Sequence, residues 1–500
     1  MYSIKKITCI TGRLKKKIKR LLKKQKYETA LVTISVCARL LYSVNQTYYD
    51  ADLENSIQQI SQEFFKEKYE FVKKTKSNLK DCILFYDGFG FDNRGLAQIY
   101  LEALAKTNYI IYVTNSRSKN SIQNITKIVT QSGELIFLDE KSYLQKMVDL
   151  KKIVDVFCPS KMFLYTTPDD VVGIGVFNYY DKKILRYQIN LTDHAFWLGV
   201  NAFDYCLEFR NYGASISCLY RHIDINKIRV LPFYPKINYN VNFQGFPFSF
   251  DKDKQKLIFS GGSLYKTLGG ENRYYHIVRY ILANFIDTVF WYAGSGDTTE
   301  LNKLIKEYPN RVFITDERSD FYQIILKCFF YLSTYPIVGG LMFQYAAAAG
   351  KVPLTLKYDD CSNDFLINQK ELGIEFESLN DLFNEIDYLF NSPDELNLRG
   401  ECLKKSVISK DIFESNIKKL LNEQRTDFKV VIYDVNVKEF QENYLKRFKL
   451  LDFCEIFRSK AFFWSIFKTF PVKTCFSCLY TQFKRMKFRR TVSRNDRRKV

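Results

Sequence analysis

Short apolar runs recur along the first half of the chain, separated by polar or glycine-rich segments. The first run, at 83–86, precedes a segment whose apolar residues have helical spacing, and the next run follows at 109–113. This order predicts a β-α-β unit. Further strands are expected at 135–138, 162–165, 184–189, 203–208 and 228–231. Because these strands alternate with helices, we expect a mostly parallel sheet covered on both faces.

A second alternating series follows residue 256. Its strands are expected at 257–260, 288–293, 312–315, 329–333 and 352–356. Helices are expected later at 378–390 and 410–422, and Ser378 is a suitable N-cap for the first of them. The pattern therefore predicts an α/β protein with two Rossmann-like domains, and a cleft between two such domains is a common ligand site.

The segments outside these halves have other patterns. Residues 27–78 have apolar residues at helical spacing, and Asp52 is a suitable N-cap there. In 236–255, asparagine, proline and glycine punctuate aromatic residues, which is typical of a linker. We expect five parts: a basic, helical N-terminal extension (1–78), an N-terminal Rossmann-like domain (79–235), a linker (236–255), a C-terminal Rossmann-like domain (256–425), and a helical, basic C-terminal extension (426–500).

Composition agrees with this division and narrows the class of protein. A chain of 500 residues with 46% hydrophobic residues is too long for one core. No stretch reaches the ~18 uninterrupted apolar residues that a spanning helix needs. The 12 cysteines are scattered, and Cys475 and Cys478 form a lone C-x-x-C without further ligands nearby. We expect reduced thiols, a cytoplasmic protein and no metal site.

The net charge of +20 is concentrated at the two ends. Residues 1–26 hold eleven Lys or Arg and no acid, and 457–500 hold thirteen against the single acid Asp496, so the body between them is close to neutral. This distribution disfavours a protein that wraps nucleic acid and favours ends that touch an anionic membrane surface. Solvated, disordered tails are the alternative. The aromatic segment 461–480 suits either an interfacial segment or a packed C-terminal helix.

Glycine-rich turns mark the second half as a candidate phosphate site. The strand at 257–260 runs into Gly261, Gly262 and Ser263, with Lys266 three residues later. Amide groups of such turns and of helix N-termini bind phosphates, and the lysine adds a positive charge. Two more turns of this kind supply further candidates: Gly294, Gly339, Gly340, Leu341, Gln344 and Tyr345. Gln344 is expected to bind ribose hydroxyls; a tight strand–helix turn packed by alanines is the structural alternative.

The first half offers candidates for catalysis and acceptor binding. His194, one of three histidines, follows the predicted strand at 184–189 beside Asp193, where α/β sheets line their ligand sites. It is a candidate general base, a substrate-binding group, or a structural loop histidine. A glycine-rich turn after the first strand contains Gly90, Asp92 and Arg94, which are candidates for sugar hydroxyls and an anionic group on the acceptor side.

Together these residues resemble a GT-B glycosyltransferase, similar to the family-4-like enzymes of bacterial capsule and exopolysaccharide biosynthesis. The resemblance covers roughly 82–425 and is strongest over 257–356. It implies two Rossmann-like domains facing across a cleft, the first binding the acceptor and the second the nucleotide-sugar donor. By the resemblance, Ser263, Lys266 and the amides of Gly340 and Leu341 would contact the diphosphate, and Gln344 would face the ribose.

The chain departs from that family at the loop expected to hold the donor sugar. Retaining members carry two glutamates there, and this chain has Pro336 and Gln344 instead. Retention and inversion of stereochemistry therefore both stay open, and an inverting reaction would need Asp193 or His194 as its base. The resemblance implies no metal and no cofactor beyond the donor substrate, since a lysine and a helix dipole can stabilise the leaving diphosphate.

The sequence thus predicts a cytoplasmic hexosyltransferase-like enzyme, peripheral on the inner face of the plasma membrane. It would transfer a sugar from a nucleotide-sugar to a hydroxyl of a lipid-linked or polysaccharide acceptor. A catalytically inactive nucleotide-sugar-binding partner subunit is the alternative. An RNA-binding protein that uses its basic ends is a weaker rival, because the body is close to neutral.

Overall fold

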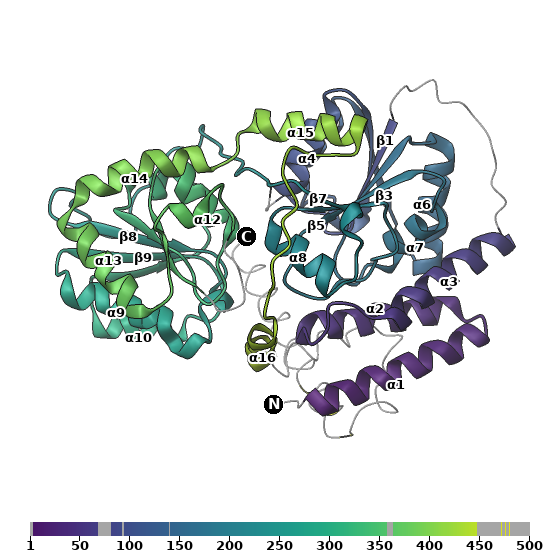
Figure 1. Cartoon of the computed structure of the whole chain (residues 1–500), viewed down its shortest axis with the longest axis horizontal. Coiled ribbons are helices and arrows are strands. Elements are labelled where there is room, and N and C mark those ends of the chain that lie inside the picture. Colours follow the sequence, from purple (N-terminus) through teal and green to yellow (C-terminus); the bar gives the residue numbers. More distant parts are fainter. Residues whose placement is uncertain are drawn as a thin grey trace, which may run out of the picture. The chain divides into compact units, whose positions relative to one another are not determined.

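The computed structural model describes residues 4–68, 82–92, 95–139, 141–357 and 364–447, together with positions 472, 476 and 480. It contains two parallel sheets flanked by helices, which confirms the predicted α/β class (Figure 1). Contacts divide the chain into two compact units. The first unit comprises Met1–Glu208, Gly213–Arg229 and Tyr444–Val500, and the second comprises Phe209–Tyr212 and Val230–Asn443.

The first unit is built on a seven-stranded sheet with the order β3-β2-β1-β4-β5-β6-β7. Every residue of β1 is buried, as its apolar run predicts, because helices cover both faces of a parallel sheet. The strands are β1 (Cys82–Asp87), β2 (Tyr109–Asn115), β3 (Gly133–Leu138), β4 (Lys161–Tyr165), β5 (Leu185–Asn190), β6 (Tyr205–Glu208) and β7 (Ile228–Val230). The helices between them are α4 (Leu96–Ala105), α5 (Gln123–Val129), α6 (Tyr143–Phe157), α7 (Val171–Tyr179) and α8 (Asn211–Leu219).

The second unit has a six-stranded sheet with the order β10-β9-β8-β11-β12-β13. Its strands are β8 (Lys256–Gly261), β9 (Thr288–Ala293), β10 (Val312–Thr315), β11 (Phe330–Leu332), β12 (Pro353–Leu356) and β13 (Glu375–Phe376). Its helices include α9 (Arg273–Asn284), α10 (Thr299–Glu307), α11 (Phe321–Lys327), α12 (Gly340–Ala348), α13 (Leu379–Asn391), α14 (Pro393–Ser406) and α15 (Lys410–Glu423), and α16 (Lys438–Arg447) follows them. The Ser378 side chain accepts the amide of Asp381, so the predicted N-cap is confirmed.

The N-terminal extension belongs to the core of the first unit. It forms α1 (Ile4–Lys23), α2 (Tyr27–Val44) and α3 (Ala51–Lys68), whose apolar residues share one hydrophobic cluster with β1, α6 and α7. The alternative of a disordered basic tail is therefore wrong for residues 4–23. The predicted N-cap Asp52 is also wrong: the helix begins at Ala51, two residues earlier than an N-cap at Asp52 requires, and Asp50 accepts the amide of Leu53 at 3.2 Å.

Polar side chains join the extension to the sheet domain. Glu28 on α2 accepts the amides of Tyr143 and Leu144 at the start of α6, at 3.1 and 2.9 Å. Arg39 on the same helix donates to Asp169. A carboxylate at a helix N-terminus satisfies amides that have no partner within the helix. These contacts fix the register of α2 against the first sheet.

The expected linker at 236–255 packs on the second unit. Four phenylalanines alternate with exposed residues and contact the sheet core: Phe243, Phe246, Phe248 and Phe250. Phe248 stacks on Phe313 with ring centroids 4.1 Å apart. The amide of Gln244 donates to the buried carboxylate of Asp320 at 2.7 Å. This segment therefore packs its aromatic rings on Trp291 of β9 and Phe313 of β10.

Several sequence predictions concern residues outside the described ranges. These are the C-x-x-C pair Cys475 and Cys478 and nearly all of the basic C-terminal end, including most of 461–480. Within the described ranges, no helix combines the length and the apolar character needed to cross a membrane. The same ranges contain no group of three or more His, Cys, Asp or Glu side chains arranged to hold a metal ion.

Candidate functional site

Two neighbouring strand ends in the second unit form the glycine-rich candidate site. Beyond the paired strands β8 and β9, the amide of Gly262 donates to the carbonyl of Ala293 at 3.0 Å, and the amide of Leu264 donates to Ser295 at 2.9 Å. The two turns therefore continue the strand pairing beyond the carboxyl ends of β8 and β9. This backbone ladder brings the predicted segments 261–264 and 293–296 side by side.

The glycines of this site are required for different reasons. A Cβ on Gly294 would lie 1.9 Å from the carbonyl oxygen of Gly262, and a Cβ on Gly340 would lie 2.4 Å from the Phe365 ring. Both positions therefore need glycine for packing. Gly262 has φ +119°, but a Cβ there would meet no atom within 4 Å. The space beside Gly262 is open, as an approaching ligand requires.

Lys266 is anchored next to the start of α12. It lies in the short 3-10 helix Leu264–Thr267, and its carbonyl accepts the amide of Ile337 at 3.3 Å. A Cβ on Gly339 would lie 3.5 Å from the Lys266 Nζ, so the ammonium group sits beside the first turn of α12. The first amides of a helix lack partners within it. A lysine beside such amides suits an anion such as a phosphate.

Not all amides of the predicted set are available for a ligand. The amide of Gly262 bonds to Ala293, and that of Gly294 donates to Thr315 at 2.9 Å. Within the described residues, the Ser263 amide and hydroxyl have no hydrogen-bond partner in the protein. Ser263, Gly340 and Leu341 therefore remain the donor candidates. Sequence reasoning missed Ser333 at the end of β11, whose buried hydroxyl has no partner within the described residues.

Gln344 and Tyr345 have structural roles that the sequence did not indicate. Gln344 is 4% exposed, and its Nε2 donates to the carbonyls of Phe233 and Phe365 at 3.1 and 3.0 Å. The Tyr345 hydroxyl donates to the carbonyl of Lys236 at 2.8 Å. Both side chains hold neighbouring backbone within the second unit. The geometry does not support the expected contact of Gln344 with a ribose.

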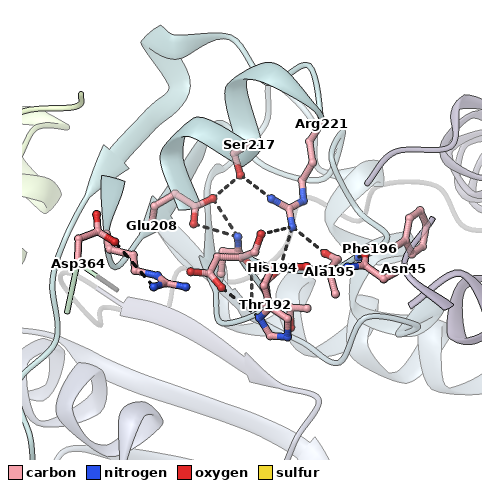
Figure 2. Close-up of polar contacts among 12 residues, drawn as sticks. Asn45, Thr192, His194, Ala195, Phe196, Glu208, Ser217, Arg221 and Asp364 are labelled. Atoms are coloured by element: carbon pink, nitrogen blue, oxygen red, sulfur yellow. Dashed lines mark hydrogen bonds and ion pairs between the residues drawn. The ribbon is translucent and has the colours of Figure 1, made fainter. Parts of the chain in front are cut away.

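In the first unit, the loop after β5 that carries His194 is held by one buried arginine. Figure 2 shows the Arg221 guanidinium pointing into this loop. Its Nη2 donates to the carbonyls of Thr192, Asp193 and Ala195 at 2.8, 2.9 and 2.7 Å. Three carbonyls on one guanidinium fix the path of the backbone on both sides of His194.

The charge of Arg221 is balanced within the core. Its Nη1 donates to the Ser217 hydroxyl at 3.1 Å, and Ser217 donates to the carboxylate of Glu208, which Asn190 also contacts (Figure 2). Burial raises the pKa of Glu208 and lowers that of Arg221, and the attraction between the two groups opposes both shifts. A buried charge of this kind is tolerated only when it is paired and hydrogen-bonded.

Asn45 clamps the same loop from the N-terminal extension (Figure 2). Its Nδ2 donates to the carbonyl of His194 at 2.8 Å, and its Oδ1 accepts the amide of Phe196 at 3.2 Å. Asn45 ends α2 in the left-handed conformation, φ 45°, which asparagine tolerates better than most residues. The extension therefore helps to shape the loop that presents the candidate base.

Asp193 and His194 form a polar pair. Asp193 is 1% exposed, its Oδ1 lies 3.2 Å from the His194 Nδ1, and the histidine side chain is 32% exposed. A proton on Nδ1 donated to Asp193 makes Nε2 the basic nitrogen. A carboxylate that orients a solvent-reaching imidazole in this way is the arrangement of a general base.

The acceptor-side predictions fare differently. Asp92 accepts the amides of Asn124 and Ile125 at 2.7 and 3.0 Å, so it holds the first turn of α5 and the geometry does not support the expected sugar contact. Gly90 has φ +63°, and a Cβ there would lie 1.9 Å from the Ser118 hydroxyl, so packing explains this glycine. Arg94 lies outside the described residues.

Three carboxylates of the first unit are buried, which the sequence did not indicate. Glu54 on α3 accepts the amide of Gly199 at 2.8 Å, and burial raises its pKa to about 7. Asp87 and Asp170, near the end of β1, have their pKa values raised to about 6 by burial. Asp87 accepts the amides of the turn at 89–90, and Asp170 caps α7. The turn residues around Asp87 and the cap position of Asp170 were visible in the sequence, but their burial was not.

Comparisons with known proteins identify the architecture. No family model matches the chain, and no curated protein sequence matches it. Similar solved structures include the S. aureus protein TarM, with a TM-score of 0.52 and 12% identity over 69% of this chain and 98% of that one. A glycosyltransferase of Rickettsia africae has a TM-score of 0.51 and 11% identity, again over 69% of this chain and 98% of that one. A mutant O-GlcNAc transferase of Thermobaculum terrenum is also similar, with a TM-score of 0.50 and 12% identity over 88% of this chain and 82% of that one. At this identity the similarity shows the fold alone, and that fold is GT-B.

Proposed function

We propose that this protein is a glycosyltransferase that moves a sugar from a nucleotide-sugar to a hydroxyl of a lipid-linked or polysaccharide acceptor. The observation that carries the proposal is the position of Lys266 beside the first turn of α12, near the open side of Gly262. The solved structures with this fold include proteins named as glycosyltransferases, which agrees with the proposal.

The second unit would bind the donor. Lys266, the Ser263 hydroxyl and the amides of Gly340 and Leu341 would hold the diphosphate. As the bond between the sugar and the diphosphate breaks, negative charge grows on the leaving oxygen, and the ammonium group and the helix amides would stabilise it. This device needs no metal ion. Gln344 is not assigned to the proposed site, because its Nε2 donates to two backbone carbonyls.

The first unit would activate the acceptor. In an inverting reaction the acceptor oxygen forms a bond to the anomeric carbon, the bond to the diphosphate breaks, and the hydroxyl proton passes to the His194 Nε2. Asp193 would hold Nδ1 and stabilise the imidazolium that results. A retaining reaction would use His194 to bind a substrate hydroxyl instead.

The test is nucleotide binding and turnover with UDP-, GDP-, CMP- and dTDP-sugars. We expect calorimetry to show binding of one nucleotide class to the wild type, with at least tenfold weaker binding by Lys266→Ala. Lys306→Ala is the matched control, because this lysine is exposed on α10 of the same unit. Binding of no nucleotide, or equal binding by both variants, would overturn the site.

A catalytically inactive nucleotide-sugar-binding subunit is the second candidate. One observation favours it: the two positions where retaining relatives carry glutamates hold Pro336 and a Gln344 whose side chain is committed to backbone carbonyls. It predicts binding without release of free nucleotide, even with a lipid-linked acceptor. Turnover that is lost in His194→Ala, with unchanged nucleotide affinity, would instead support the enzyme.

A further inference from the structure

Helix α1 divides sharply into an apolar and a cationic face. One face carries five buried side chains, which belong to the hydrophobic cluster of the first unit: Ile7, Ile10, Leu14, Ile18 and Leu22. Each is at most 7% exposed. The apolar face of this helix is therefore fully used within the protein, and it is not available for insertion into a bilayer.

The opposite face of α1 presents positive charge to solvent. Lys5, Lys16, Arg20 and Lys23 are exposed and fall within about 60° of one another around the helix. From Lys5 to Lys23 this face spans about 27 Å. We call these four residues the α1 cationic face. No acid occurs anywhere in residues 1–26.

Acidic neighbours neutralise only the flank of the helix. Lys15 pairs with Asp50 at 2.9 Å, and Lys19 pairs with Asp52 at 2.8 Å. Among the described residues, no carboxylate forms an ion pair with Lys16, Arg20 or Lys23. The cationic face therefore keeps its charge while the flank is balanced, and the body of the chain at 27–456 is close to neutral.

The composition of this face indicates the kind of partner. Sequence-reading nucleic-acid surfaces place amides or arginines at base edges, and single-strand binders add aromatic rings for stacking. The α1 cationic face has a single arginine, Arg20, and no aromatic or amide side chain; the uncharged exposed residues between its cations are Thr8 and Cys9. A straight row of charges on a rigid helix matches an extended plane of phosphate-bearing headgroups, to which each Lys or Arg adds attraction.

We infer that the α1 cationic face docks this protein on an anionic lipid surface, with the helix axis parallel to the membrane and no insertion of apolar side chains. The inference is independent of the glycosyl-transfer proposal, since it uses no residue of the donor or acceptor sites. The docking surface is thus one face of an ordered helix and not a disordered basic tail.

Deletion of 1–26 cannot test this inference. It would strip five buried side chains from the core of the first unit, and loss of large core side chains destabilises a protein strongly. Charge reversal of exposed residues is the cleaner change. The test variant is Lys16→Glu/Arg20→Glu/Lys23→Glu, and the matched control is Lys252→Glu/Lys306→Glu/Lys405→Glu, which changes the net charge equally at exposed positions of the second unit.

The measurement is co-sedimentation of the full chain with phosphatidylcholine vesicles that contain 0 or 30% phosphatidylglycerol. We expect the wild type and the control to bind only the anionic vesicles, with affinity that falls steeply between 50 and 300 mM salt, and the test variant to bind at least tenfold more weakly. Equal binding by all three proteins would overturn the inference. Tighter binding of a 20-nucleotide RNA than of vesicles at the same salt would overturn it in favour of a nucleic-acid partner.

A gain-of-function variant checks the orientation of the helix. Gly12 lies on the outer half of α1, and a Cβ there would meet no atom within 4 Å. Because tryptophan favours the membrane interface, Gly12→Trp should tighten vesicle binding severalfold and make it less sensitive to salt. Unchanged binding by a folded Gly12→Trp protein would contradict a membrane-facing outer surface.

Discussion

The two candidate sites are held in opposite ways. In the first unit, the His194 loop is fixed by side chains that arrive from distant elements, chiefly Arg221 from beyond α8 and Asn45 from the end of α2. In the second unit, the phosphate cradle is fixed by backbone groups, through the ladder between 262–264 and 293–295 and through glycines in close packing.

This difference predicts different sensitivities. A loop held by buried side chains fails when one of them is truncated, because donors, acceptors or charges are left without partners. A cradle held by backbone fails when an atom is added at Gly294 or Gly340, because no space exists there for a Cβ. Arginine and asparagine side chains therefore hold the candidate site of the first unit, and closely packed glycines hold that of the second.

The largest effect should come from Arg221. Arg221→Met leaves Glu208 buried without its counter-charge and three loop carbonyls without donors, so we expect a loss of about 3–5 kcal/mol in the free energy of unfolding. Urea denaturation measures this loss. The double variant Arg221→Met/Glu208→Gln should recover part of it. A loss below about 1 kcal/mol would break the view that charge holds this loop.

Gly294→Ala tests the backbone-built site. The added Cβ meets the Gly262 carbonyl, so we expect the free energy of unfolding to fall by about 1–3 kcal/mol, as measured by denaturation. Nucleotide affinity, measured by calorimetry, should fall as well, because the two turns of the site move apart. Gly12→Ala is the control. It adds the same methyl group to a helix with open space, and it should be neutral or stabilising by up to about 1 kcal/mol. Equal effects of the two substitutions would contradict the packing argument.

Asn45→Gly distinguishes the two roles of Asn45, its left-handed backbone conformation and its side-chain hydrogen bonds to the His194 loop. Glycine tolerates the left-handed conformation of position 45 but removes both hydrogen bonds to the His194 loop, so we expect a loss of about 1–2 kcal/mol. If the clamp positions His194, turnover should fall while nucleotide affinity stays unchanged, because the donor site lies in the other unit. Loss of stability with full turnover would limit Asn45 to a structural role.

The last prediction concerns pH and a buried carboxylate of the first unit. The folded-state pKa of Glu54, about 7, lies above its ordinary value of 4.5, so the native state holds the proton more tightly between these values. Stability linked to Glu54 is therefore present at low pH and is lost as the pH rises to about 7. Glu54→Gln should flatten this decline between about pH 4.5 and 7, as measured by urea midpoints. Parallel pH profiles of the two proteins would contradict the assignment.

The sequence pattern was a good guide to the strands and a poor guide to long-range polar contacts. Buried strands in a parallel sheet are nearly continuous apolar runs, so each expected strand is present, whereas β13 has two residues and leaves no pattern. For residues 4–23 a disordered tail stayed open beside the helical extension, because the many charges obscure the spacing of Ile7, Leu14 and Ile18. That spacing is helical and was available in the sequence.

The candidate sites show the same limit. The glycine turns and Lys266 could be found locally, because a phosphate site at a strand end needs residues close together in sequence. Arg221 and Asn45 could not, since Asn45 contacts residues 149 and 151 positions away. The resemblance also gave Gln344 a ligand role that its burial does not support, because alignment conveys position and not surroundings.

The clamp between the extension and the His194 loop has a consequence for synthesis of the chain. Asn45 and Glu54 emerge from the ribosome some 145 residues before their partners. At ordinary translation rates of ~5–20 residues per second, that interval is on the order of 10 s. During it, the first sheet is incomplete, so part of the apolar surface of α1, α2 and α3 stays exposed, and exposed surfaces of this kind aggregate readily. Recovery of folded protein should therefore depend on chaperones that bind the nascent N-terminal helices.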